Sequence, residues 1–184
     1  MVDFRVSNKS LTIQSYKNQY NVFFCDDGAQ HLLDNLPENC NFHLIMDKQV
    51  SLLYKEQFSK LFDNYSVLII EAQEKNKSLE SLPIYVSQLV KNKIRKNDVL
   101  IAVGGGIIQD ITCFLSATLL RGLKWYFYPT TLLSQADSCI GSKSSINSGD
   151  SKNLLGTFTP PAKVIIGKNF LKTLEQKDLR SGVG

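Results

Sequence analysis

The sequence predicts an α/β domain with a Rossmann-like, mostly parallel sheet, flanking helices and an N-terminal β-hairpin. From residue 41 onwards, apolar runs of strand length recur with helical or loop segments between most of them: NFHLIM, SVLII, VLIAV, WYFY and KVIIG. Unbroken apolar runs of this kind are typical of parallel strands that are buried on both faces. The first 25 residues instead alternate apolar and polar side chains in the short runs FRV, LTIQSY and YNVFF, which indicates a hairpin or edge strands.

Composition and charge are those of a single globular domain over residues 1–184. Of the 184 residues, 43% are hydrophobic and 21% are charged. The net charge of +4 is small and the Lys and Arg residues are scattered, which favours anionic small ligands over nucleic acid. The four cysteines form no CxxC pair, as in a reduced cytosolic protein. No signal-peptide run or membrane-spanning run is visible, so we expect a cytoplasmic chain without membrane contact.

Three helices are expected between the strands. The segment 78–92 has helical spacing, but Pro83 would clash inside a helix begun at Ser78, so we expect this helix to start near Ser81 with that serine as its cap. The segment 107–120 is apolar nearly all round, which predicts a helix buried on most sides. The segment 49–62 is expected to form one helix that packs a single apolar stripe on the sheet, made of Val50, Leu53, Tyr54, Phe58 and Leu61.

A triple glycine follows the run VLIAV, at the carboxyl end of a predicted strand. Gly104, Gly105 and Gly106 could let the backbone approach a phosphate, or could form a plain strand-to-helix turn. The motif departs from the GxGxxG dinucleotide fingerprint at Gln109, so the glycines alone leave both interpretations open. Asp110, expected in the first turn of the helix that follows, could stabilise the helix dipole or could contact a ligand hydroxyl or cationic ring.

Polar side chains are concentrated after the run WYFY. Such a density of polar groups beside buried strands predicts a ligand site. A solvated loop is the alternative; it would explain Ser148–Ser151, but not two lysines placed on either side of Asn147 amid small residues. The residues concerned are Thr130, Thr131, Asp137, Lys143, Asn147, Lys152 and Asn153.

Several motifs between residues 98 and 184 stand in a specific order and spacing: GGGIIQDITCFLSATLLRG, YPTTLLSQADSCIGSKSSIN, SKNLLGTFTPPAKVIIGKNFLKTL and LRSGVG. Together they resemble the N-terminal, cofactor-binding half of the 3-dehydroquinate synthases and of the wider sugar-phosphate cyclase family. The resemblance extends more loosely back to Asp47 and Glu74. One departure is GSKSSIN at 141–147, where the family usually has Gly-Gly-Lys-Thr-Gly/Ala-Val/Ile-Asn. Cyclases that make inosose or valiolone rings therefore stay open beside 3-dehydroquinate synthase.

The resemblance implies an NAD site around the glycine turn, with Asp47 on the adenosine ribose and the segment FLKT near the adenine. The cofactor-binding residues that it implies are Asp47, Glu74, Lys77, Gly104, Gly105, Gly106, Asp110, Thr130, Thr131, Asp137, Lys143, Lys152, Phe170, Leu171, Lys172 and Thr173. It implies catalytic roles for Lys143, Lys152 and Asn153, and substrate contacts from Arg121, Asp137, Asn147, Lys152 and Asn153. In some members, the arginine that matches Arg121 reaches the substrate phosphate from the partner subunit of a homodimer.

The reaction implied by the resemblance converts a phosphorylated sugar into a carbocycle, as a carbon–oxygen lyase. NAD takes a hydride from a ring carbinol, phosphate is eliminated, the hydride returns and an aldol addition closes the ring. Lysines suit this substrate because they supply positive potential, and an arginine offers a bidentate fork to phosphate oxygens.

The family also uses a divalent metal, zinc or cobalt, held by a glutamate and two histidines. The resemblance places that glutamate one position past Gly184 and the histidines in a helical C-terminal domain that this chain lacks. We therefore expect no metal ligand here, and a domain that binds NAD without completing the reaction. His31 and His43 are expected to be surface or ordinary packed histidines.

Two other functions stay open at this point. One is a polyol or glycerol-phosphate dehydrogenase of the iron/zinc alcohol dehydrogenase group, which also carries a GGG-x-x-x-D turn; the SKN and FLKT stretches argue against it. The other is a non-catalytic nucleotide-binding module. A net change in NADH absorbance with substrate distinguishes a dehydrogenase from a cyclase, which shows none.

Overall fold

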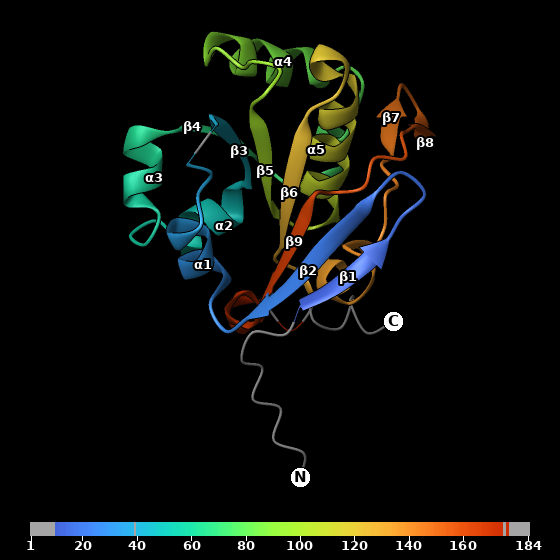
Figure 1. Ribbon diagram of the computed structural model, residues 1–184. Coiled ribbons are helices and arrows are strands. Elements are labelled where there is room, and N and C mark those ends of the chain that lie inside the picture. The colour runs from blue at the N-terminus through green and yellow to red at the C-terminus, as the bar shows by residue number, and fades with distance from the viewer. Residues whose placement is uncertain (1–9, 39, 175, 177–184) are drawn as a thin grey trace.

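The computed structural model describes residues 10–38, 40–174 and 176. Its main sheet has seven strands in the order β1-β2-β9-β6-β5-β3-β4, and only the β1–β2 pair is antiparallel (Figure 1). The predicted apolar runs all form strands, so the mostly parallel α/β sheet is confirmed. The strands of this sheet are β1 (Ser10–Gln14), β2 (Gln19–Cys25), β3 (Phe42–Asp47), β4 (Ser66–Ile70), β5 (Val99–Gly104), β6 (Lys124–Pro129) and β9 (Lys163–Gly167).

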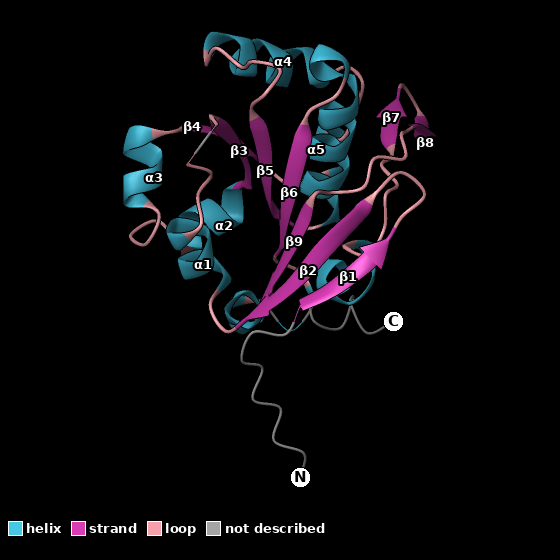
Figure 2. Ribbon diagram, in the orientation of Figure 1, coloured by secondary structure: helices cyan, strands magenta, loops and turns pink. Residues whose placement is uncertain are grey.

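Helices flank both faces of this sheet (Figure 2). Two clusters of buried hydrophobic side chains make up the core. On one face of the sheet, residues of α4 and α5 such as Leu89 and Ile111 pack on the strands, and on the other face residues of α1 to α3 such as Leu32 and Leu61 do so. β3 and β5 are buried along nearly their whole length because helices cover them on both sides. The helices are α1 (Gly28–Asp34), α2 (Lys48–Leu53), α3 (Ser59–Asn64), α4 (Leu82–Lys91) and α5 (Gly106–Thr118).

The N-terminal hairpin is part of the main sheet. β1 and β2 pair in antiparallel register, as expected, and β2 then pairs in parallel with β9, with Asn21 opposite Lys163. The run FRV, at residues 4–6, lies outside the described residues.

The single helix expected over 49–62 is wrong. The chain instead forms α2 and α3, with Tyr54–Phe58 as turns between them. Val50, Phe58 and Leu61 of the expected stripe are buried, and the Tyr54 ring lies 5.8 Å from that of Phe58 and packs edge-on against Phe170. Tertiary packing of these rings replaces continuous helical hydrogen bonding. Leu53 is 49% exposed, so its expected place on the packed stripe is also wrong.

The other two helices lie close to the expected positions. α4 has Ser81 at its N-cap position and Pro83 in its first turn, but the Ser81 side chain makes no capping hydrogen bond; its hydroxyl lies 3.0 Å from that of Ser78. α5 covers the expected apolar segment and ends in a 3-10 turn, Leu119–Arg121. Among the described residues, no helix is both long enough and apolar enough to cross a membrane.

A second, two-stranded sheet lies beside α5 and consists of β7 (Ile146–Ser148) and β8 (Ser151–Leu155) (Figure 1). Its turn contains Gly149, whose φ of 53° falls in the left-handed region that favours glycine. The last part of the predicted polar segment, from Asn147 to Asn153, is therefore an ordered hairpin, and only its tip at 149–150 is a turn of the kind that the alternative interpretation described.

Candidate functional site

The glycine turn joins the carboxyl end of β5 to the N-terminus of α5. A Cβ on Gly104 would lie 2.6 Å from Cγ1 of Ile108, and one on Gly105 would lie 2.8 Å from Cγ2 of Thr131. A Cβ on Gly106 would meet no atom within 4 Å. The first two glycines are therefore required by close packing inside the chain, whereas Gly106 borders open space.

The N-terminus of α5 can receive an anionic or polar ligand group. Gly105 is its N-cap, and no side chain caps the helix. The first backbone N–H groups of a helix have no intrahelical acceptor and carry a partial positive charge. Thr130 and Thr131 lie next to this turn, since the Thr130 N–H donates to the Gly104 carbonyl oxygen across 3.0 Å.

Asp110 stands one turn further along α5 than expected. The helix begins at Gly106, so no acidic residue occupies its first turn and the prediction on this point is wrong. The effect of the helix dipole falls off within the first turn, so the dipole contributes little to stabilising the Asp110 carboxylate. Its carboxylate instead faces β7, where it accepts hydrogen bonds from the Ser145 N–H at 3.0 Å and the Ser145 hydroxyl at 2.9 Å.

Lys77 lies at the centre of a buried polar cluster beside α5. Its side chain is only 8% exposed. The segment after β4, α5 and the β7–β8 hairpin all supply oxygen partners to its Nζ. These partners are Asp110 Oδ2 at 3.2 Å, Glu74 Oε1 at 3.3 Å, Ser145 Oγ at 3.3 Å and Asn153 Oδ1 at 3.0 Å.

Asn147 connects the hairpin to the segment that carries Glu74 and Lys77. Its side-chain amide donates to Glu74 Oε1 at 2.9 Å, and its Oδ1 accepts from the Asn153 N–H at 2.8 Å. Its backbone N–H donates to the Lys77 carbonyl oxygen at 2.9 Å. Asn153 has a φ of 54°, in the left-handed region that is uncommon for residues other than glycine. The structure thus brings together five of the predicted site residues, Glu74, Lys77, Asp110, Asn147 and Asn153.

Burial and charge act against each other at these carboxylates. Burial raises the pKa of Asp110, although Lys77 and Ser145 partly offset the rise. The hydrogen bond from Asn147 is the main reason why the pKa of Glu74 is lowered, and Lys77 and Lys152 add to this effect. The buried Lys77 ammonium thus pairs with two carboxylates, and the exposed Lys152 acts on one of them.

Asp47 ends β3, the strand next to β5, and caps α2. Its carboxylate accepts from the Gln49 N–H at 3.0 Å. Burial raises the pKa of Asp47, while the backbone N–H groups of Gln49 and Ala72 lower it. The side chain therefore has a structural role at the same carboxyl edge of the sheet as the glycine turn, with carboxylate lone pairs left for a ligand.

The remaining predicted cationic and polar residues near the hairpin are exposed. Asp137 lies in a short π-helix, Ser134–Ser138, and Lys143 in the loop that follows it. Lys152 lies on β8, close enough to Glu74 to lower its pKa. None of these three is among the residues that hold Lys77.

Arg121 and the FLKT segment lie apart from the cluster. Arg121 is exposed in the turn after α5, at the opposite end of this 13-residue helix from the glycine turn, which is a length of about 20 Å. Phe170 belongs to a 3-10 helix, Lys168–Thr173, and its ring is buried in the core of the α1–α3 face, with Leu171 half-buried beside it. Lys172 and Thr173 of the same turn are exposed.

The sequence did not identify Ser145 as a site residue, and it did not predict the β7–β8 hairpin that begins directly after Ser145. The signal for the hairpin was present, because Gly149-Asp150 separates two short polar stretches and glycine followed by aspartate is common in tight hairpin turns. No comparable signal marked the Ser145 side chain, whose partners are distant in sequence.

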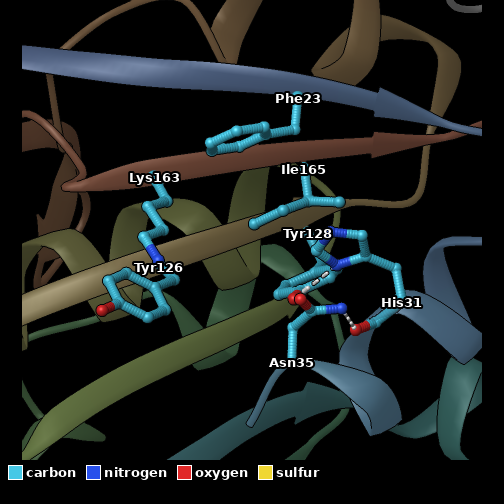
Figure 3. Close-up of a pocket in the computed structure, with 7 residues that line it drawn as sticks. All are labelled: Phe23, His31, Asn35, Tyr126, Tyr128, Lys163 and Ile165. Atoms are coloured by element: carbon cyan, nitrogen blue, oxygen red, sulfur yellow. Dashed lines mark hydrogen bonds between the residues drawn. The ribbon is translucent and has the colours of Figure 1, made fainter. Parts of the chain in front are cut away.

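Both histidines make side-chain hydrogen bonds away from the cluster. His31 lines a cavity of about 100 Å³ between α1 and the sheet, and its Nδ1 lies 3.2 Å from the Tyr128 hydroxyl. Figure 3 shows the two side chains turned towards each other. His43 lies at the amino edge of the sheet, between Ser66 Oγ at 2.9 Å and Asp98 Oδ2 at 3.1 Å. Over residues 10–38, 40–174 and 176, no three His, Cys, Asp or Glu side chains gather in a way that could hold a metal ion.

These features define a three-layer α/β domain with a polar cluster and an uncapped helix beside the carboxyl edge of its sheet. The model of the 3-dehydroquinate synthase N-terminal family matches residues 67–181. The chain therefore belongs to this family. The segment LRSGVG, part of the resemblance noted above, lies outside the described residues.

A curated relative agrees with this assignment, and solved structures share the fold. The 3-dehydroquinate synthase of Pelagibacter ubique (strain HTCC1062) is 37% identical over 95% of this chain and 49% of its own length. A 2-deoxy-scyllo-inosose synthase solved with carbaglucose-6-phosphate, NAD+ and Co2+ superposes with a TM-score of 0.80 at 22% identity, over 95% of this chain and 50% of that one. ValA, the 2-epi-5-epi-valiolone synthase of Streptomyces hygroscopicus subsp. jinggangensis 5008 solved with NAD+ and Zn2+, gives 0.76 at 27%, over 98% and 50%. The chain spans about half the length of these proteins.

Proposed function

We propose that this chain is the NAD-binding part of a metal-dependent sugar-phosphate cyclase of the 3-dehydroquinate synthase type, a carbon–oxygen lyase. The observation that carries the proposal is the Lys77–Asp110 cluster beside α5, whose uncapped N-terminus and glycine turn can take an anionic group. Membership of the 3-dehydroquinate synthase family and the NAD+ present in the ValA structure support it. The dehydrogenase and the non-catalytic module are not favoured, because the family model and the curated relatives are those of cyclases.

The residues present fit NAD. Gly106 borders open space, and the N–H groups at the start of α5 would bind the pyrophosphate, with Thr130 and Thr131 beside them. Asp47 would accept from the adenosine ribose. Bound NAD would supply reversible acceptance of a hydride from the substrate, while the protein orients the two.

The sugar phosphate would meet the polar residues of the hairpin. Lys143 and Lys152 are exposed and carry the positive charge that a phosphate needs, and Asn153 presents an amide beside Lys77. Arg121 lies at the far end of α5, so we propose that it acts on a phosphate held by the partner subunit of a homodimer. The divalent metal, zinc or cobalt, would be held by ligands in the rest of a longer protein.

Titration of the chain with NAD tests the cofactor assignment. NAD should bind in calorimetry and raise the Tm by mass action. Lys93→Ala, at the opposite edge of the sheet, is the matched control and should bind NAD as the unmodified chain does. Absence of heat and of a Tm shift at millimolar NAD contradicts the proposal.

The substrate is tested with the complete enzyme against a panel of phosphorylated sugars. Phosphate release without a net change in NADH absorbance is expected from a cyclase. A lasting increase in NADH absorbance would instead indicate the dehydrogenase. The sugar that gives the highest kcat/KM then distinguishes 3-dehydroquinate synthase from cyclases that form inosose or valiolone rings.

A further inference from the structure

We infer that Ser145 is a positioning residue that fixes the direction from which Asp110 can accept a hydrogen bond from a ligand. The inference rests on the proposed function, since it concerns the same site. Ser145 lies immediately before β7 and donates two hydrogen bonds to the Asp110 carboxylate: its backbone N–H donates to Oδ1 at 3.0 Å and its hydroxyl donates to Oδ2 at 2.9 Å.

The two partners of the Ser145 hydroxyl fix its orientation. The hydroxyl carries one proton, which it donates to Asp110, and its lone pair accepts from Lys77 Nζ at 3.3 Å. Lys77 has three N–H donors for four oxygen partners within hydrogen-bond distance. The ammonium is therefore saturated by the protein, and a ligand that used it would have to displace one of these partners.

Asp110 keeps capacity for one more partner. Two carboxylate oxygens offer about four acceptor positions, and the Lys77 ammonium, the Ser145 N–H and the Ser145 hydroxyl take three of them. The position left open is set by where Ser145 sits. Because an ionised carboxylate only accepts hydrogen bonds, the group that binds there must be a donor, such as a sugar hydroxyl or an amide N–H, and not a phosphate.

The groups that act on Asp110 come from several elements. Lys77 and Glu74 face it from the segment after β4, Lys152 acts on Glu74 from β8, and Cys113 lies one turn along α5. Burial raises the pKa of Cys113 to about 11, so this thiol stays neutral through the range tested. Burial raises the pKa of Asp110 and the Ser145 bonds lower it, so removal of the hydroxyl should raise this pKa further.

The test compares Ser145→Ala, which loses the hydroxyl, with Ser145→Thr, which keeps it. Ser148→Ala, at the end of the adjoining strand β7, is the control, because its hydroxyl is not part of the cluster. NAD affinity is measured by calorimetry between pH 5.5 and 8. Ser145→Ala should bind NAD roughly tenfold more weakly at pH 7, as expected when a hydrogen bond to a charged group is lost. As the pH is lowered, Ser145→Ala should lose NAD binding at a higher pH than the unmodified chain does. Ser145→Thr should keep both the affinity and the pH profile of the unmodified chain.

A second measurement separates this inference from the proposed function. The pKa of Asp110 is measured by carboxyl ¹³C NMR on the chain without NAD, in all four proteins. An upward shift in Ser145→Ala alone supports the positioning role even if the unmodified chain binds no NAD, which would overturn only the cofactor proposal. An unchanged pKa, or an unchanged NAD affinity and pH profile in a chain that does bind NAD, overturns the inference.

Discussion

Nζ of Lys77 lies 3.2 Å from Oδ2 of Asp110, and this ion pair joins the segment after β4 to α5 beneath the β7–β8 hairpin. Lys77 has a second acidic partner in Glu74, but the Glu74 side chain is 43% exposed and that of Asp110 only 20%, so Asp110 depends more on this ion pair. The cluster therefore both holds the segment after β4 against α5 and forms a candidate ligand site, and mutations can separate these two roles.

Lys77→Met should destabilise the chain by about 3 kcal/mol, because it leaves the Asp110 carboxylate buried without its cation. Glu74→Gln removes a partly exposed partner and should cost less than about 1 kcal/mol. Urea unfolding of both variants measures the difference. The double variant Lys77→Met/Asp110→Asn should recover part of the loss, and a purely additive result would show that the two residues do not interact.

Gly105 and Gly106 should respond differently to an added side chain. Gly105→Val places a Cβ against Thr131 and should lower both stability and NAD affinity. Gly106→Ala meets no protein atom, so the fold should keep its stability to within about 0.5 kcal/mol, while the methyl group enters the space proposed for NAD and weakens binding. Thermal unfolding and calorimetry on the same samples make this comparison. Full NAD affinity in both variants would place the cofactor elsewhere.

Asp110→Asn should also weaken NAD binding, since an amide cannot accept at both oxygen positions and loses the charge that Lys77 pairs with. The loss should be greatest at neutral pH and should disappear at a pH below the raised pKa of Asp110, where the unmodified side chain is protonated too. Calorimetric titrations across this range measure the effect. Equal affinity at every pH would contradict a role for the carboxylate.

Asp47→Asn should change stability and binding in opposite directions. Burial raises the pKa of Asp47 above 3.8, so its charge lowers stability at pH 7, and the free energy of unfolding gains as pH falls through the folded-state pKa. Asparagine keeps the cap of α2 without the charge, so the variant should be at least as stable at pH 7, and this advantage should vanish towards pH 4. NAD affinity should fall if the carboxylate holds the ribose. Denaturant unfolding at the two pH values and an NAD titration test both statements.

The FLKT segment can be divided in the same way. Phe170→Ala should cost about 3–5 kcal/mol, because the ring is fully buried against Tyr54 and Gly28. Lys172→Ala changes an exposed side chain and should leave stability within about 0.5 kcal/mol. Lower NAD affinity in the lysine variant would support the proposed adenine contact, and unchanged affinity would assign the segment to the core alone.

Much of the fold was predictable because its signals are local. Apolar runs such as VLIAV mark a strand buried on both faces wherever it lies in the sheet, and Pro83 limits where α4 can begin. The break between α2 and α3 was not predictable, because the apolar stripe has the same period with or without the intervening hydrogen bonds.

The site was predictable only in part. The resemblance implied ligand-binding roles for Lys77, Asp110 and Asn153, and the structure places the three side chains in contact, while their roles stay predictions. Ser145 was missed because its importance comes from Lys77, 68 positions away, and from Asp110, 35 positions away. A pattern read along the chain does not report which hydroxyl turns towards which carboxylate.

The pairing of β2 with β9 also determines how the sheet must assemble. Asn21 and Lys163 are neighbours across these strands, although nearly the whole described chain separates them. Such a contact forms only after a long loop has closed, which slows folding. Until β9 is inserted, the edges of β2 and β6 that face it have no partner strand. We therefore expect a late, cooperative final step in folding, and a chain cut before β9 should aggregate through these open edges.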